Sequence, residues 1–194
     1  TYYTSIGVSK QDLNKVELNK EYKKAIIRSI YDTNGTSPVP EDAIKAYFSE
    51  NYVTFKSIIG LFQTTDDDGN VTDISQEKKD QLVSQFTQMK QSIDGGTSFE
   101  QVNAAYQSTG GEVEGSAMDT SIISAESHTF PTGTFENIKA IERGASGVFT
   151  VGRYIFLVQR ENELANESFY KTYRNSCLIG LKSAEFEKTA EEWA

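Results

Sequence analysis

The chain has 194 residues, of which 37% are hydrophobic and 24% are charged, as in an ordinary soluble globular protein of one large domain or two small ones. Its net charge is −9 and its pI is about 4.7. An acidic chain repels phosphate backbones, and its densest basic stretch, residues 20–28, is interrupted by Glu21, so nucleic-acid binding is not expected. No run approaches the roughly 18 apolar residues of a membrane span.

The first third of the chain predicts two helices followed by a strand. Ser9 begins a helix that extends to Tyr31, and residues 32–40 break it with an Asn-Gly pair and two prolines. A second helix follows over 41–51. Over 52–62 the hydrophobic period changes to two. One face of this strand carries Val53, Phe55, Ser57, Ile59 and Leu61, of which only the serine is polar.

The rest of the chain alternates helices with short strands. An acidic turn over 64–72 precedes a helix over 73–93, which Gly95 and Gly96 end. A short helix from Ser98 to Tyr106 follows. The remaining expected elements are a loop with one short strand over 112–132, a short helix around 135–141, strands over 148–151 and 153–160, and a helix from 166 onward. In that last helix the expected apolar stripe is Phe169, Tyr173, Cys177, Leu181 and Ala184. These elements predict an α+β fold with long helices at both ends.

Few residues offer catalytic or metal chemistry. The run from Asp66 to Asn70 suggests a calcium loop, but the end positions of such a loop lack carboxylates, and a solvated acidic turn is the preferred interpretation. His128 is the single histidine, which excludes a two-histidine metal site and leaves no motif for nucleophilic catalysis. Cys177 is the single cysteine and is expected to be a buried thiol. We expect no metal and no cofactor.

Several segments in the middle of the chain follow one another in a recognisable order. They are the strand 52–59, the Gly-Gly-Thr-Ser-Phe-Glu run at 95–100, the glycine pair 110–111, the Phe-Glu pair 135–136, and the two runs 144–148 and 152–155. In this order they resemble the parvulin-type peptidyl-prolyl isomerase domain of PrsA-like and SurA-like bacterial folding factors. Helices before and after the middle stand where PrsA-like proteins carry a helical chaperone module.

The resemblance implies a domain organisation and a setting. A parvulin-like domain with a small antiparallel sheet would span 52–160, and a discontinuous helical chaperone-like module would consist of 1–51 and 161–194. The partners would be unfolded or proline-containing polypeptides, outside the cytoplasm. Because the chain starts at Thr1 without a methionine or a signal peptide, targeting or a membrane anchor would lie in a preceding segment. The oligomeric state is left open.

The resemblance also assigns site positions. The family's two histidines correspond to Ser57 and Tyr154, and its acidic or thiol group falls in the loop near Ser108. Phe135 matches the phenylalanine of the proline pocket. Two further positions, Phe130 and Met118, are expected to bind substrate. Three hypotheses follow: a chaperone or foldase with a degenerate site, an active isomerase that uses hydroxyl groups, and a structural protein that reuses the fold.

Overall fold

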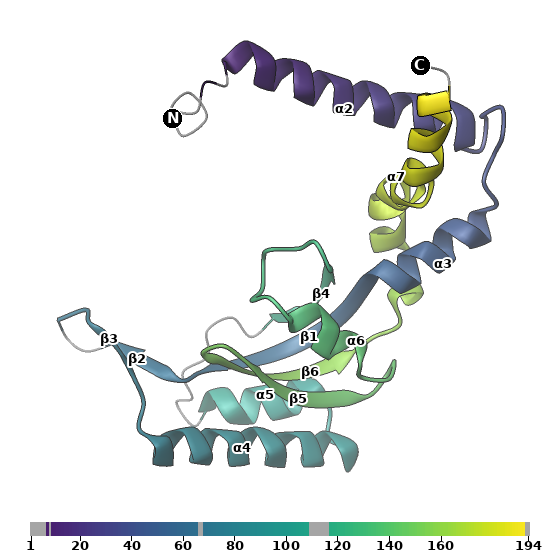
Figure 1. Cartoon of the computed structure of the whole chain (residues 1–194). Coiled ribbons are helices and arrows are strands. Elements are labelled where there is room, and N and C mark those ends of the chain that lie inside the picture. Colours follow the sequence, from purple (N-terminus) through teal and green to yellow (C-terminus); the bar gives the residue numbers. More distant parts are fainter. Residues whose placement is uncertain (1–6, 8, 66–67, 109–116, 193–194) are drawn as a thin grey trace. The chain divides into compact units, whose positions relative to one another are not determined.

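The computed structural model describes residues 7, 9–65, 68–108 and 117–192, which divide into two compact units. Unit 1 consists of Thr1–Glu50 and Glu167–Ala194, and unit 2 consists of Asn51–Asn166. The two ends of the chain therefore build one unit, and the middle builds the other (Figure 1). No helix within the described ranges is long and apolar enough to cross a membrane.

Unit 1 is helical and consists of α2 (Lys10–Tyr31), α3 (Glu41–Asn51) and α7 (Glu167–Glu192). Ser9 begins α2 as predicted, because its hydroxyl accepts a hydrogen bond from the Asp12 amide in a capping box. Its core residues are Ile27, Tyr31, Ile44, Phe48, Tyr170, Cys177 and Leu178. Of the apolar stripe expected on α7, Cys177 is buried, Phe169, Tyr173 and Leu181 are half-buried, and Ala184 is exposed. The helix also buries Tyr170 and Leu178, which the stripe did not include.

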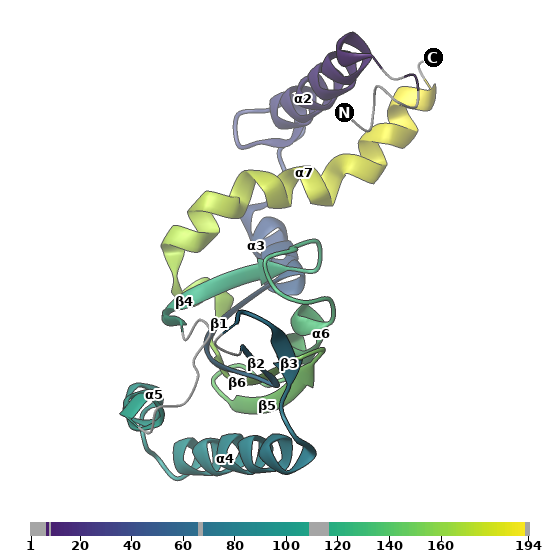
Figure 2. The same ribbon diagram turned by 90° about the vertical axis from the view of Figure 1, so that its left-hand side faces the viewer.

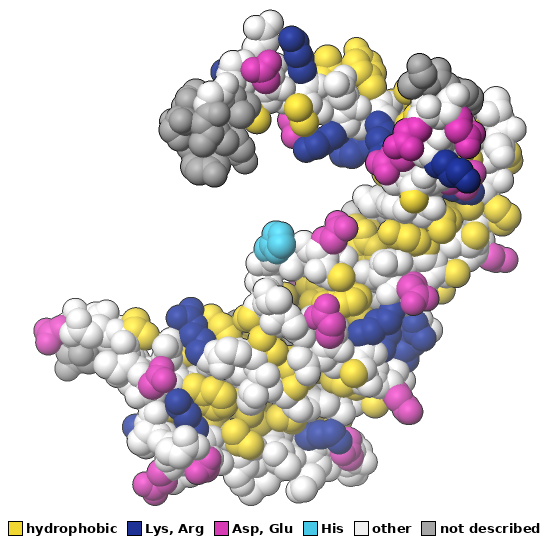
Figure 3. Space-filling view, in the orientation of Figure 1, with side chains coloured by type: hydrophobic (Ala, Val, Ile, Leu, Met, Phe, Trp, Pro, Cys, Tyr) yellow, Lys and Arg dark blue, Asp and Glu magenta, His cyan; other side chains and the backbone are white. Residues whose placement is uncertain are grey.

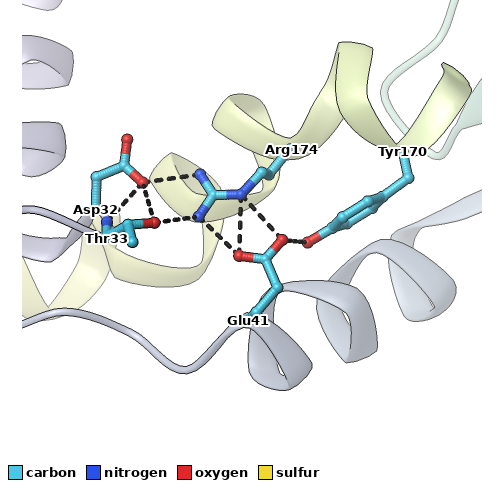
Figure 4. Close-up of polar contacts among 5 residues, drawn as sticks. All are labelled: Asp32, Thr33, Glu41, Tyr170 and Arg174. Carbon is cyan, nitrogen blue, oxygen red and sulfur yellow. Dashed lines mark hydrogen bonds and ion pairs between the residues drawn. The ribbon is translucent and has the colours of Figure 1, made fainter. Parts of the chain in front are cut away.

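A polar network ties the three helices of unit 1 together (Figure 4). The Arg174 guanidinium donates from Nε to both Glu41 oxygens at 3.0 Å, and from Nη1 to Asp32 at 2.8 Å. Tyr170 donates to the same Glu41 carboxylate at 2.5 Å. The Arg174 hydrogen bonds hold the pKa of Glu41 below its usual value. Arg174 on α7 thus fixes both the end of α2 and the start of α3.

Unit 2 is built on an antiparallel sheet of four strands in the order β4-β1-β6-β5. Its strands are β1 (Tyr52–Leu61), β4 (Ala117–Ser124), β5 (Ser146–Val151) and β6 (Tyr154–Arg160). The expected turn over 64–72 is instead a hairpin of β2 (Gln63–Thr65) and β3 (Val71–Asp73). The strand expected within 112–132 is also longer than predicted, at eight residues. The segment 63–73 is poor in apolar residues, and in β4 the apolar residues come as two adjacent pairs, 117–118 and 122–123, so neither segment shows a period-two pattern.

The helices of unit 2 are divided between the two sides of this sheet. On one side lie α4 (Gln76–Asp94) and α5 (Phe99–Ser108), and on the other lies α6 (Thr134–Lys139) (Figures 1 and 2). Helix α4 begins three residues later than predicted, because the Ser75 hydroxyl caps it. A short 3₁₀ turn, η1 (Glu163–Ala165), follows β6. The α+β fold class with a small antiparallel sheet is confirmed.

Each side of the sheet has its own core. Ile58, Ile155 and Leu157 pack against α4 and α5, together with Phe86, Met89, Phe99, Val102 and Tyr106. At Gly60 the Phe86 ring comes so close that an added Cβ would lie 3.0 Å from it. The opposite core contains Phe55, Phe156 and Val158 and is covered by Ile138 of α6. The sheet is therefore buried on both sides, and the second core carries the candidate site.

Candidate functional site

The side of the sheet that faces α6 is unusually aromatic. Because side chains alternate along a strand, Phe55 and Ser57 of β1 and Tyr154 and Phe156 of β6 point to this side. We call it the aromatic face, and it comprises Phe55, Phe130, Phe135, Phe149, Tyr154 and Phe156. In a space-filling view, hydrophobic side chains reach the surface over unit 2 (Figure 3).

The rings of the aromatic face form a floor and a rim. Phe55 and Phe156 are the buried floor, whereas the other four rings are half-buried. Phe130 contacts both floor rings edge-on, with centroids 5.5 Å and 6.3 Å away, and Phe149 stacks on Phe156 at 5.1 Å. Edge-to-face and offset-stacked rings add about 0.5–1.5 kcal/mol per pair to the free energy of burial. Phe130 and Phe149 are thus held against the floor, and all four rim rings still present part of their surface to solvent.

Ser57 lies within this apolar surrounding. Its side chain is fully buried, and its hydroxyl has no hydrogen-bond partner among the described residues. An unpartnered buried hydroxyl costs roughly 1–3 kcal/mol, and the buried hydroxyls of Thr54, Thr134 and Ser146 also have no partner among the described residues. A serine hydroxyl stays neutral at ordinary pH and can donate one hydrogen bond, but it does not exchange protons as an imidazole does.

Tyr154 lies on the same face of the sheet as Ser57 but at a different position along the strand direction. It pairs with Leu61, whereas Ser57 pairs with Val158. Four residues along a strand separate the two positions by roughly 13 Å. The Tyr154 hydroxyl accepts a hydrogen bond from Arg153 Nη2 at 2.9 Å. The structure therefore does not join the two hydroxyls into one network.

The remaining positions that the resemblance assigned are dispersed. Ser108 is the last residue of α5 and not part of a loop, and its hydroxyl donates to the Ala105 carbonyl at 2.7 Å. That helix covers the other side of the sheet. Phe130 and Phe135 both belong to the aromatic face. Met118 lies in β4, but its side chain falls outside the described residues. The structure thus brings Ser57, Phe130, Phe135 and Tyr154 to one face and leaves Ser108 out.

A buried ion pair positions α6 on the aromatic face, and sequence reasoning missed it. Arg160 is only 5% exposed and Glu163 is fully buried. Arg160 Nη2 donates to Glu163 Oε1 at 2.7 Å, and its Nη1 donates to the carbonyls of Lys139 and Ile141 at 2.7 and 2.8 Å. These carbonyls lie at the end of α6. A charged pair three residues apart, directly after an apolar strand, was the available signal.

Glu163 remains ionised in this site. Burial alone would raise the pKa of its carboxyl, but hydrogen bonds from Arg160 and from Arg143, whose Nε lies 2.6 Å away, outweigh that effect and lower it. The negative charge is needed because it compensates the buried guanidinium of Arg160. The pair thus anchors α6, and with it Phe135, to the end of β6.

The described residues give no support for a metal site. Over 7, 9–65, 68–108 and 117–192, no group of three His, Cys, Asp or Glu side chains is placed to hold a metal ion. Asp66 and Asp67 of the considered calcium loop lie outside those ranges. His128 is exposed in the segment between β4 and α6. Cys177 is buried, as expected.

Comparison with known proteins gives one result of note. No protein-family model matches the chain, and no curated protein matches it. Among solved structures, the chain is similar to the foldase protein PrsA from Streptococcus pneumoniae str. Canada MDR_19A, with 13% sequence identity and a TM-score of 0.41. The match covers 93% of this chain and 60% of the PrsA chain, so this chain spans less than two thirds of that protein. At this level of similarity, any function must be argued from the residues of the chain itself.

Proposed function

We propose that this protein is an extracytoplasmic folding factor that binds unfolded polypeptide on the aromatic face of unit 2. The observation that carries the proposal is the set of four half-buried aromatic rings around the floor of Phe55 and Phe156. Partly exposed, well-fixed rings are suited to proline and other apolar side chains, which leave water when they bind. The extracytoplasmic setting comes from the resemblance of the sequence to parvulin-type folding factors.

The chemistry of the aromatic face favours binding a polypeptide over isomerising its prolyl bonds. Rotation about a prolyl bond has a barrier of roughly 18–20 kcal/mol, and an isomerase lowers it by binding the twisted amide more tightly than the planar one. That requires several polar groups around one amide. Ser57 supplies one hydroxyl, whereas Tyr154 lies roughly 13 Å further along the sheet. Ser108 lies in α5, which covers the other side of the sheet.

Aggregation of an unfolded client tests the proposal directly. We expect the chain to suppress light scattering by reduced α-lactalbumin at a few-fold molar excess. The double variant Phe130→Ala with Phe135→Ala should lose most of this effect, because it removes two rim rings from the aromatic face. The matched control is Val83→Ala, which shortens a 39% exposed side chain of α4 instead.

Circular dichroism of each variant establishes that it is folded before the comparison is made. Aggregation that proceeds unchanged at several-fold excess of the wild-type chain would contradict the proposal. If Val83→Ala loses the suppression of aggregation to the same extent as the double variant, the aromatic face is not the binding site.

A second candidate function, an active prolyl isomerase, has one observation in its favour: the unpartnered hydroxyl of Ser57 on the aromatic face. In a protease-coupled assay with an Ala-Pro tetrapeptide, we expect the wild-type rate to equal the rate in buffer. A measurable rate that Ser57→Ala lowers at least tenfold, while Ser108→Ala leaves it unchanged, would replace the chaperone assignment with an enzymatic one.

A further inference from the structure

Unit 2 has a second hollow surface, on the side of the sheet opposite the aromatic face. An open groove of about 320 Å³ runs between α4 and α5. The nearly buried side chains of Met89, Val102 and Tyr106 form its apolar floor, and Ala105 adds an exposed methyl group. Gln85, Gln88 and Gln101 contribute three amide groups. The three residues of the apolar floor belong to the core beneath these helices. The groove is therefore supported from below by the sheet.

The chemistry of the lining is narrow. Among the described residues that line the groove, there is no aspartate, glutamate, lysine, arginine or histidine. A charged ligand would lose its hydration there without gaining a counter-ion, which makes its binding unfavourable. Within the part of the chain that the structure describes, the side-chain amides of Gln85 and Gln88 have no hydrogen-bond partner. The groove thus offers neutral donors and acceptors beside apolar surface.

A glutamine amide carries the same pair of groups as a peptide bond, a carbonyl acceptor and an N–H donor. Gln101 uses its carbonyl oxygen to accept from the Ser98 amide at 3.2 Å, which holds the side chain in place. The thioether of Met89 adapts to side chains of different shape. These features match an extended main chain with uncharged side chains.

We propose that the groove between α4 and α5 is a second polypeptide-binding surface, selective for extended, uncharged segments. That the ligand is a polypeptide rests on the proposed function. The groove is a separate surface from the aromatic face. Because the two surfaces lie on opposite sides of one sheet, two segments of a single unfolded chain can be held at once. The second contact then becomes intramolecular, so a long client binds more tightly than a short peptide.

The test uses the full chain labelled with ¹⁵N and a blocked octapeptide of alternating serine and leucine as the probe. We expect the peptide to shift amide resonances of α4 and α5. Ala105→Trp, which fills the groove from an exposed position of its lining, should weaken this binding at least tenfold. Ala104→Trp is the matched control, because Ala104 is also exposed on α5 but does not line the groove, and we expect it to leave the affinity unchanged.

A second pair of variants tests the selectivity for uncharged segments. Gln88→Glu places a charge in the groove and should weaken binding, whereas Gln91→Glu, one turn further along α4 and outside the lining, should not. Equal affinities for Ala105→Trp and Ala104→Trp would overturn the inference, as would shifts confined to the aromatic face. Groove binding that persists while aggregation suppression is absent would support the groove and contradict the proposed function.

Discussion

Glu163→Ala is expected to lower the stability of unit 2 by about 3–5 kcal/mol, the cost of leaving one partner of a buried ion pair without the other. Glu163 is fully buried, and its carboxylate is the counter-charge of Arg160, which is 5% exposed. Arg160 in turn holds the last carbonyls of α6. We therefore expect hydrogen–deuterium exchange to rise in β6 and in α6, and chemical denaturation to show an earlier transition.

The matched control is Lys90→Ala, which breaks the ion pair with Asp94 on the surface of α4. Exposed pairs contribute only about 0.2–1 kcal/mol, so this variant should unfold nearly as the wild type does. Equal destabilisation by the two variants would show that the buried pair has no special role. Replacing Arg160 and Glu163 together by Met and Leu should restore part of the stability, because no uncompensated charge remains buried. The recovery is incomplete because the carbonyls of Lys139 and Ile141 lose the donor that Arg160 supplied.

The same pair gives unit 2 a dependence on acid. The folded-state pKa of Glu163 is lowered, so its contribution to stability is fully present above the pKa of the unfolded chain and is lost as the pH falls through the folded pKa. Between neutral pH and about pH 5 the contribution should stay constant. Below that range, wild-type stability should fall faster than the stability of Glu163→Ala.

Arg174→Met is expected to destabilise unit 1 by about 2–3 kcal/mol, in the range of hydrogen bonds to charged groups. The substitution removes the guanidinium that bonds to Asp32 and Glu41 and leaves two carboxylates close together on a surface that is partly protected from solvent. The side chain of Arg174 is 18% exposed, so solvent screens the loss only in part. A thermal melt followed by helical circular dichroism measures the change.

Two further variants establish whether the geometry of the guanidinium matters. Arg174→Lys keeps the charge but not the planar fork, and we expect it to recover less than half of the lost stability. Lys171→Ala removes an exposed pair with Glu167 on the same helix and should change the melting temperature little. A Lys171→Ala effect as large as that of Arg174→Met would contradict the role assigned to the network.

Much of the fold followed from patterns that are local in sequence. Period-two alternation identified β1 to within one residue of its end, and the serine cap identified the start of α2. Both signals come from neighbouring residues. The hairpin of β2 and β3 was not predicted because its strands have three residues each, are mostly polar and bury no residue fully, so they show no alternation of apolar and polar positions. The fold class was predictable because the helices and the apolar strands that define it are each encoded by patterns among neighbouring residues.

The candidate site was predictable only where one strand face decides the orientation of a side chain. Ser57 and Phe55 share a face by alternation, and the sequence was enough to place them together. The distance between Ser57 and Tyr154 depends on the register of β1 with β6, which no local pattern encodes. The bonds from Arg160 to the end of α6 join residues about twenty positions apart, and only tertiary packing brings them into contact.

The two ends of the chain build unit 1, and this has a consequence for synthesis on the ribosome. Translation delivers α2 and α3 before unit 2, whereas their partner α7 emerges only after unit 2. Unit 2 is complete in sequence by Asn166 and can fold while α7 is still being translated. Until α7 has been translated, the apolar side of α2 around Ile27 and Tyr31 has no α7 to cover it. The nascent chain is therefore itself a polypeptide with exposed apolar surface until α7 has emerged.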